Sequence, residues 1–135
     1  MASDCHKRDA ANSHRDEVAS LLRSKADWRV DGLARCLHTA NIPEGITLGN
    51  SRNSEMNLIL KREAISNYMF YLAFENSIET GYVTEKLFDG LIAGTVPIYL
   101  GSTVEARKLI PHPKSVIFLD DFKVVQHTFF RTLAK

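Results

Sequence analysis

Four side chains that could form hydrogen bonds or ion pairs with a ligand stand at helical spacing in the second half of the chain. Tyr82, Glu85, Lys86 and Asp89 stand at positions i, i+3, i+4 and i+7, so a helix would place them on one face, opposite its apolar residues. A solvated helix face gives the same pattern, and spacing alone favours that plainer interpretation. The surroundings of the segment therefore decide whether it forms a site.

The location of this face favours a binding site. Residues 70–74 form a short, continuous apolar run, typical of a strand buried in a parallel sheet, and Glu75 and Asn76 follow it directly. Ligands of open parallel sheets bind where the carboxyl ends of strands meet helix N-termini, which attract anions. Lys86 in the first helical turn would add a cation suited to a phosphorylated ligand. On the plainer interpretation, Glu75 and Asn76 only cap a turn.

Further cations stand near the beginning of the chain. Arg15, and Lys7 with Arg8, could add positive charge from the first loop and helix, although each alone is typical of an ordinary surface cation. The glycine-rich phosphate-binding signatures G-x-G-x-x-G and G-x-x-x-x-G-K-[ST] are absent. We therefore expect a diphosphate to be held by lysine and arginine rather than by a glycine-rich loop.

Alternating helix and strand patterns predict the elements that position these side chains. Helices are expected over residues 14–25, 83–93, 104–109 and 121–133, and strands over 28–30, 70–74, 96–100 and 116–119. A further helix should begin at a cap formed by Ser54. Its apolar positions, which recur at helical spacing, are Met56, Ile59, Leu60 and Ala64. Residues 38–53, rich in Asn, Gly and Pro, predict a flexible loop. The alternation predicts an α/β fold with a parallel sheet and helices on both faces.

Several positions carry finer expectations. The helix over residues 83–93 should turn an apolar face inward and be closed by Gly94. This face comprises Val83, Leu87, Phe88, Leu91 and Ile92. Pro97 indicates that no neighbouring strand needs the N–H at its position. For Asp120 and Asp121, we favour helix N-capping over a role in a site.

Composition predicts one soluble globular domain over residues 1–135, with 44% hydrophobic and 24% charged residues. The net charge of +1 does not favour nucleic acid or a membrane surface as partner, and no apolar run reaches the roughly 18–20 residues that span a bilayer. The cysteines and histidines lack metal-ligand spacing, so no zinc site is expected. Before any fold is assumed, Cys5 and Cys36 are best interpreted as unrelated thiols.

A composite motif adds a family resemblance. It consists of Phe-Tyr-Leu-Ala-Phe-Glu-Asn-Ser (70–77), Tyr-Val-Thr-Glu-Lys-Leu (82–87), Ala-Gly-Thr-Val-Pro (93–97), Leu-Gly (100–101) and Asp-Asp-Phe (120–122). In order and spacing, residues 68–123 resemble the α1,3/4-fucosyltransferases. Ser3-Asp4-Cys5 looks like the family's Ser-Asn-Cys with Asp4 replacing Asn, and Arg15 looks like the arginine that follows it, at a longer spacing. Gly81 stands where an acidic residue is usual.

The resemblance implies a Rossmann-like, GDP-fucose-binding domain, the C-terminal half of a GT-B inverting glycosyltransferase. By carry-over, Arg15 and Lys86 would contact the diphosphate, Tyr82 and Glu85 the ribose or fucose, and Glu75 and Asn76 would line the pocket. Fixed cations and a helix N-terminus would stabilise the departing GDP, so no metal or other cofactor is obligatory. The partners implied are GDP-fucose and, for the full-length parent, a glycan acceptor containing N-acetylglucosamine.

The resemblance also implies what a full-length parent would add. An N-terminal domain would hold the acceptor and the general base, and a eukaryotic parent would lie on the lumenal side of the Golgi membrane. We therefore interpret the chain as a truncated donor half, lacking a signal, an anchor and one central strand. In that fold, Cys5 and Cys36 would be either a disulfide or free thiols, and their placement resembles the plant-type, core-fucosylating members. The alternatives are a non-catalytic GDP-sugar-binding module and an inactive remnant.

Overall fold

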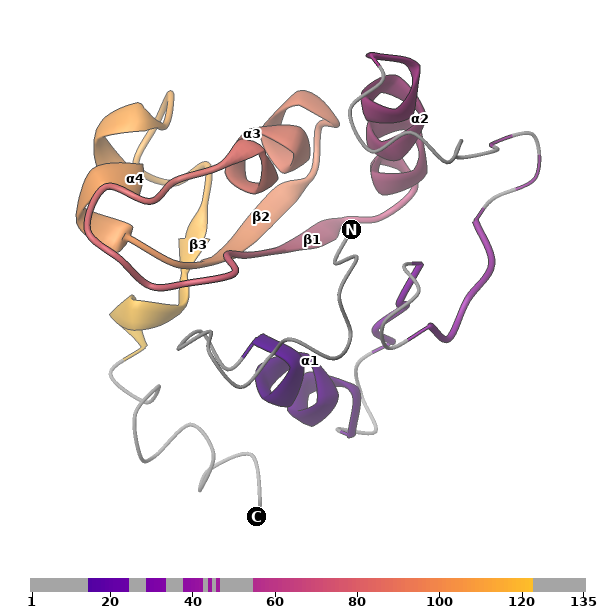
Figure 1. The fold of residues 1–135 in the computed structure, drawn as a ribbon, viewed down its shortest axis with the longest axis horizontal. Helices are drawn as coiled ribbons and strands as arrows, with labels where there is room; N and C mark the ends of the chain where they lie inside the picture. The colour runs from indigo at the N-terminus through magenta and orange to yellow at the C-terminus, as the bar shows by residue number, and fades with distance from the viewer. Residues whose placement is uncertain are drawn as a thin grey trace.

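A three-stranded parallel sheet in the order β1-β2-β3 forms the centre of the computed structural model (Figure 1). The structure describes residues 15–24, 29–33, 38–42, 44, 46 and 55–122. β1 (Phe70–Phe74) pairs along its whole length with β2 (Val96–Leu100), and β3 (Ile117–Phe118) pairs with β2 from Ile98 onward. The apolar runs at residues 70–74 and 96–100 are therefore strands, as predicted.

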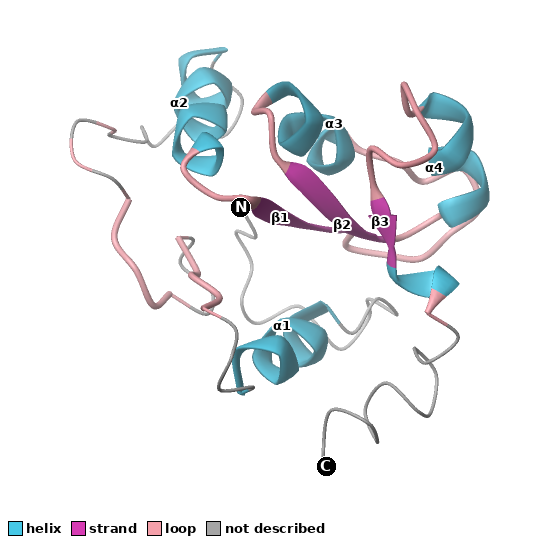
Figure 2. Cartoon of the chain, turned by 180° about the vertical axis from the view of Figure 1, so that it is seen from behind, coloured by secondary structure: helices cyan, strands magenta, loops and turns pink. Residues whose placement is uncertain are grey.

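Four α-helices accompany the sheet in the described part of the chain. They are α1 (Arg15–Ser24), α2 (Glu55–Ser66), α3 (Glu85–Ile92) and α4 (Thr103–Leu109), and a 3₁₀ helix (Leu119–Asp121) follows β3. Figure 2 shows α1 on one side of the sheet and α3 and α4 on the other. The parallel sheet with helices on both faces confirms the expected α/β class.

Each face of the sheet has its own hydrophobic core, because side chains alternate between the faces along a strand. On the α1 face, buried Val18 and Leu22 pack with Phe74 of β1, Ile98 and Leu100 of β2, and Leu119 of the 3₁₀ helix. On the opposite face, Leu87 of α3 and Ala106 of α4 pack with Ala73, Tyr99, Val116 and Phe118. By the same alternation, the side chains of Phe74 and Glu75 point to opposite faces of the sheet.

The bounds and the inward face of α3 differ from the expectation. Val83 precedes the helix, because Thr84 is its N-cap, and Ala93 is the C-cap, followed by Gly94 at φ +76°. Leu87 is buried and Phe88 and Leu91 are packed against the core, whereas Ile92 is 61% exposed at the end of the helix. Gly90 faces the sheet so closely that a Cβ there would lie 2.8 Å from the Tyr71 ring.

The predicted strand at residues 28–30 is wrong for its described part, since Arg29 and Val30 lie in no strand. The Val30 carbonyl instead accepts a hydrogen bond of 3.2 Å from Nε of Arg23, and the Val30 side chain packs on the α1 core. The Arg23 side chain thus donates the hydrogen bond that the Val30 carbonyl would receive from a neighbouring strand. In the predicted loop 38–53, the described residues 38–42, 44 and 46 lie in no helix or strand, and whether the loop is flexible stays a prediction.

Other expectations need smaller changes. In α2, Ala64 and Ile65 are buried but Met56 and Ile59 are at least half exposed, so the helix makes contact mainly through its second half. Asp120 and Asp121 lie within the 3₁₀ helix, whose N-cap is Phe118, and bind Thr103 and Arg107 of α4; whether they also cap the expected terminal helix stays a prediction. The Ser54 cap, the terminal helix beyond residue 122, and Asp4, Lys7, Arg8, Cys5 and Cys36 lie outside the described residues.

Pro97 is tolerated in the central strand because of where β3 begins. The N–H of Val96 donates to Met69 on the β1 side, so position 97 faces the other side. There, β3 pairs with β2 only from Ile98 onward. As predicted, the missing N–H of Pro97 costs the sheet no hydrogen bond among the described residues.

Candidate functional site

Glu75 organises the junction between β1 and α3. Its N–H donates to Leu100 at 2.9 Å, which continues the pairing of β1 with β2, and its side chain is completely buried. The carboxylate accepts hydrogen bonds from the backbone N–H of Thr84 at 2.8 Å and from the Thr84 hydroxyl at 2.6 Å. Glu75 thus fixes the residue that caps α3.

Lys86 is held by the same carboxylate. Its Nζ lies 3.3 Å from Oε2 of Glu75, 2.9 Å from Oγ1 of Thr84 and 3.5 Å from Oε1 of Glu85. The Lys86 side chain is 15% exposed, and its ammonium group has two carboxylates as neighbours. The group formed by Glu75, Glu85 and Lys86 therefore carries two negative charges and one positive charge.

Glu85 is the exposed member of this group, with 53% of its side chain accessible. Partial burial would raise the pKa of the Glu85 carboxyl. The charges of Lys86 and Lys61, its own backbone N–H and the Thr84 hydroxyl outweigh that effect and hold the pKa below its usual value. The carboxylate is thus ionised at neutral pH and free to accept hydrogen bonds from hydroxyl groups.

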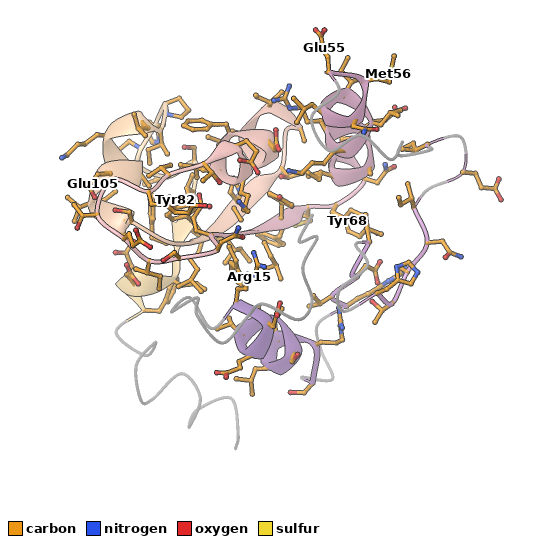
Figure 3. All side chains as sticks on the ribbon, in the orientation of Figure 1. Arg15, Glu55, Met56, Tyr68, Tyr82 and Glu105 are labelled. Atoms are coloured by element: carbon orange, nitrogen blue, oxygen red, sulfur yellow. The ribbon has the colours of Figure 1, made fainter. Side chains whose placement is uncertain are left out.

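Arg15 and Asn76 meet although they are 61 residues apart in the sequence. Nη1 of Arg15, the first residue of α1, donates to Oδ1 of Asn76, the second residue after β1. Oδ1 of Asp16 lies 4.0 Å from Nε of Arg15. Figure 3 shows the Arg15 side chain rising from α1 toward the sheet, with Tyr82 in the loop before α3. Among the described residues, no side-chain hydrogen bond or ion pair joins Tyr82 to this group.

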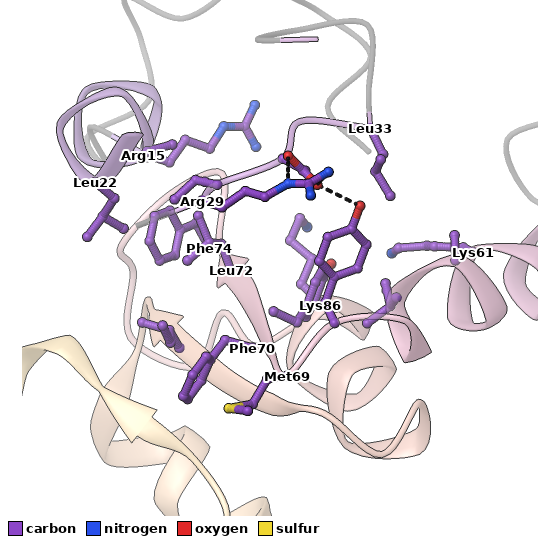
Figure 4. A pocket seen from close by; sticks show the side chains of 18 of the residues that line it. Arg15, Leu22, Arg29, Leu33, Lys61, Met69, Phe70, Leu72, Phe74 and Lys86 are labelled. Atoms are coloured by element: carbon purple, nitrogen blue, oxygen red, sulfur yellow. Dashed lines mark hydrogen bonds and ion pairs between the residues drawn. The ribbon is translucent and has the colours of Figure 1, made fainter. Parts of the chain in front are cut away.

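A cavity of about 420 Å³ adjoins these residues (Figure 4). It lies along β1, bordered by α1, residues 29–33 and the second half of α2. Arg15 and Lys86 line it, whereas Glu75, Asn76, Tyr82 and Glu85 do not. Its apolar wall includes Leu72 and Phe74 of β1. Cations at its rim and apolar side chains within it suit a ligand that carries both phosphate and a ring.

Two groups of interacting polar side chains, each with at least one member on the cavity wall, were not predicted from the sequence. In the first, Asp31 accepts hydrogen bonds from Nε of Arg29 at 3.2 Å and from the Tyr68 hydroxyl at 3.1 Å. The hydrogen bond from Arg29 is the main cause that lowers the pKa of Asp31; partial burial opposes it, and Tyr68 adds to it. This network ties the segment 29–33 to the chain just before β1. No spacing signal connects residues so far apart in the sequence.

The second group joins α2 to α3. Asp89, expected on the polar face of α3, is completely buried and accepts from Nζ of Lys61 at 2.6 Å and from Nε of Arg62 at 2.9 Å. The part of the polar face of α3 around Asp89 is therefore covered by α2, whereas Glu85 on the same face stays exposed. Consecutive cations in a helix are common at surfaces, so the sequence held no distinctive signal for this contact.

None of the described helices is long and apolar enough to cross a membrane. Within the same residues, no group of three or more His, Cys, Asp or Glu side chains is placed to hold a metal ion.

Comparison with known proteins gives related curated sequences, although no solved structure matches. The chain is 32% identical over 123 residues to alpha-(1,3)-fucosyltransferase B of Drosophila melanogaster, covering 91% of the chain and 26% of that protein. It is 34% identical to GDP-fucose protein O-fucosyltransferase 3 of Gallus gallus, covering 90% of the chain and 23% of that protein. Over 85 residues it is 41% identical to alpha-(1,3)-fucosyltransferase FucT of Helicobacter pylori, covering 62% of the chain and 17% of that protein.

The chain therefore spans about a quarter or less of the length of these relatives. A family model for the C-terminal part of glycosyltransferase family 10 (fucosyltransferase) matches residues 1–134, nearly the whole chain. The chain belongs to this fucosyltransferase family and corresponds to its C-terminal domain.

Proposed function

We propose that this chain is the donor-binding half of an inverting α1,3-fucosyltransferase that uses GDP-fucose and acts on a glycan containing N-acetylglucosamine. One observation carries the proposal: Arg15 of α1 and Lys86 of α3, which belong to opposite faces of the sheet, both line one cavity beside β1. The hydrogen bond of Arg15 to Asn76 and the ion pair of Lys86 with Glu75 lie just after β1, at the carboxyl end of a parallel strand, where open α/β sheets generally bind ligands.

The residues take the following roles in this proposal. Arg15 and Lys86 bind the diphosphate, and Glu85 and Tyr82 contact hydroxyl groups of the ribose or fucose. Asn76 orients Arg15 through their hydrogen bond. Glu75, which is completely buried, acts through Lys86 and Thr84 rather than by touching the ligand.

The chemistry follows from the charges. The bond between the anomeric carbon of fucose and the β-phosphate oxygen breaks, and its electron pair stays on that oxygen. An acceptor oxygen attacks the anomeric carbon from the opposite face and gives its proton to a base, which we assign to another domain of the full-length protein. GDP gains negative charge as it leaves, so Arg15 and Lys86 stabilise the transition state more than the ground state, without a metal.

The acceptor is the least constrained part of the proposal, and one relative supports a second candidate. The Gallus gallus relative is named a protein O-fucosyltransferase, so a hydroxyl group of a protein could replace the glycan as acceptor. Incubating the full-length parent with GDP-fucose and either N-acetylglucosamine-terminated glycans or folded acceptor proteins separates the two. Fucose on the glycan supports the first proposal, whereas fucose only on the protein supports the second.

The cellular setting is part of the same proposal. A eukaryotic parent of this chain would glycosylate proteins in the Golgi apparatus, on the lumenal side of the membrane, and would use the GT-B arrangement of two Rossmann-like domains. In that arrangement the chain binds the donor but does not transfer fucose. Release of GDP and formation of a fucosylated acceptor by the purified 135-residue chain would contradict this division of labour.

Calorimetric titration of the purified chain with GDP and GDP-fucose tests the donor site. Saturable binding is expected, with Lys86→Ala weakening it about tenfold or more, because a hydrogen bond to a charged group is worth about 1.5–3 kcal/mol. Lys108→Ala is the matched control, since that lysine lies on α4, is 70% exposed and does not line the cavity. Absence of binding by a folded sample would overturn the proposal and leave an inactive remnant.

A further inference from the structure

We infer that Lys61 of α2 is a third cation for the phosphate groups of the ligand, in addition to Arg15 and Lys86. The inference rests on the proposed function and deepens it, since it adds a residue to the same site. Lys61 lines the cavity together with Arg15 and Lys86, and the three come from different helices (Figure 4). An anion in the cavity would thus meet positive charge from three directions.

The balance of charge distinguishes Lys61 from Lys86. Lys86 has two carboxylates within 3.5 Å, Glu75 and Glu85, so its positive charge is more than compensated. Around Asp89 the balance is reversed, because Lys61 and Arg62 share this one carboxylate. The α2–α3 contact therefore presents an excess positive charge, and Lys61 is its member on the cavity wall.

Lys61 is also held in place before a ligand arrives. Its side chain is 12% exposed, and its Nζ lies 2.6 Å from the completely buried Asp89. An ammonium group has three donors, and the hydrogen bond to Asp89 uses one of them. Ordering the side chain beforehand lowers the entropic cost of binding, and limited exposure to water strengthens its attraction for an anion.

The position of Lys61 relative to the other site residues agrees with this role. Its charge contributes to the lowered pKa of Glu85, so it lies within electrostatic reach of the beginning of α3. A diphosphate carries several negative charges on adjacent groups and can engage more than one cation at once. The ligand class recognised by Lys61 is therefore a nucleoside diphosphate or its sugar ester, and a nucleoside without phosphate should not be affected by it.

A purely structural role for Lys61, neutralising Asp89, is the alternative, and Arg62 provides the matched control. Arg62 binds the other oxygen of the same carboxylate, at 2.9 Å, but does not line the cavity. Lys61→Gln and Arg62→Gln each remove one cation from Asp89. Only Lys61→Gln removes one from the cavity wall.

The experiment compares GDP affinity and thermal unfolding of the wild-type chain, Lys61→Gln, Arg62→Gln and Lys61→Arg. We expect Lys61→Gln to weaken GDP binding about tenfold. Arg62→Gln should stay within threefold of wild type, and Lys61→Arg, which keeps the charge, should lose less affinity than Lys61→Gln. The weakening should shrink at high salt, which screens the charge, and both glutamine variants should lower Tm by similar amounts. Equal affinity of Lys61→Gln and Arg62→Gln would overturn the role of Lys61 while leaving the donor site intact.

A second measurement needs no variant and applies if Lys61→Gln does not fold. Amine acetylation of the wild-type chain, read by mass spectrometry, should slow at Lys61 when GDP saturates the site, and should not change at the exposed Lys108. Equal labelling of Lys61 with and without bound GDP would overturn the inference. Failure of the wild-type chain to bind GDP at all would overturn the proposed function and this inference with it.

Discussion

The carboxylate of Glu75 lies 3.3 Å from the ammonium group of Lys86, and this contact joins the end of β1 to the first turn of α3. Glu75 is completely buried, whereas Lys86 reaches the cavity. The buried carboxylate therefore determines where the partly buried ammonium group of Lys86 lies. Such an arrangement lets the sheet, rather than a mobile loop, set the geometry of the site.

Glu75→Gln tests this relationship. The amide can still accept from the Thr84 backbone but no longer pairs its charge with Lys86, so we expect the free energy of unfolding to fall by about 1.5–3 kcal/mol. Urea unfolding measures the change. Glu85→Gln is the control, because it removes the other carboxylate beside Lys86. Glu85 is 53% exposed, so the free energy of unfolding should fall by no more than about 1 kcal/mol. Equal losses in the two variants would contradict the anchoring role of Glu75.

Arg15→Ala should weaken GDP binding about tenfold or more, because it removes a charged donor at the cavity rim and leaves Asn76 without its partner. Arg15→Lys should restore only part of the affinity, since a lysine cannot present the planar fork of donors that suits phosphate. Calorimetry gives the three affinities. Arg107→Ala on α4, outside the cavity, is expected to bind GDP as the wild type does. An unchanged affinity in Arg15→Ala would remove Arg15 from the site.

Stability should fall in acid because of Asp31 and Glu85. Both carboxyl groups have a lower pKa in the folded chain than when unfolded, so the unfolded state takes up their protons first as the pH falls. Their contribution is complete above their unfolded pKa values of about 4 and is lost as the pH falls through the folded values. Urea unfolding from pH 7 to pH 3 should show the decline. Asp31→Asn should make it less steep, and an unchanged slope would contradict the assignment.

Tyr99→Phe should leave the fold intact and raise its stability. The Tyr99 hydroxyl is buried and makes no hydrogen bond of normal geometry among the described residues, although the Ser102 backbone interacts with it. Burial, together with the nearby charge of Glu75, raises the pKa of Tyr99, so the hydroxyl is neutral at physiological pH. Removing an unsatisfied buried polar group should increase the free energy of unfolding by about 1 kcal/mol. A decrease would show that the hydroxyl has a partner in solution.

Local patterns in the sequence predicted the parts of the fold that local forces decide. The apolar run at residues 70–74 and the helical spacing after Thr84 each identify an element because burial and backbone hydrogen bonding act along the chain. The family resemblance placed Arg15 and Asn76 in one pocket, but their hydrogen bond was not predicted. Nothing in the spacing of two residues 61 positions apart predicts that they meet.

The expectations that were wrong depend on tertiary contacts. Spacing placed Asp89 on a polar face, but it could not show that α2 covers this face and supplies two cations. Val30 has strand propensity, yet it lies in no strand, and its carbonyl accepts a hydrogen bond from Arg23 of α1. In both cases the deciding partner lies in another element, and no local pattern names it.

Asp89→Asn provides the strongest test of the α2–α3 contact. Asp89 is completely buried between Lys61 and Arg62, so its neutralisation leaves two adjacent cations without their shared carboxylate. Breaking a buried ion pair from one side costs about 3–5 kcal/mol, and we expect a loss of this size in urea unfolding. Asp121→Asn removes a carboxylate that is 56% exposed from Arg107 and should cost about 1 kcal/mol or less. If the free energy of unfolding falls equally little in both variants, this charge cluster does not hold α2 against α3. The position of Lys61 on the cavity wall must then depend on the buried apolar side chains of Ala64 and Ile65.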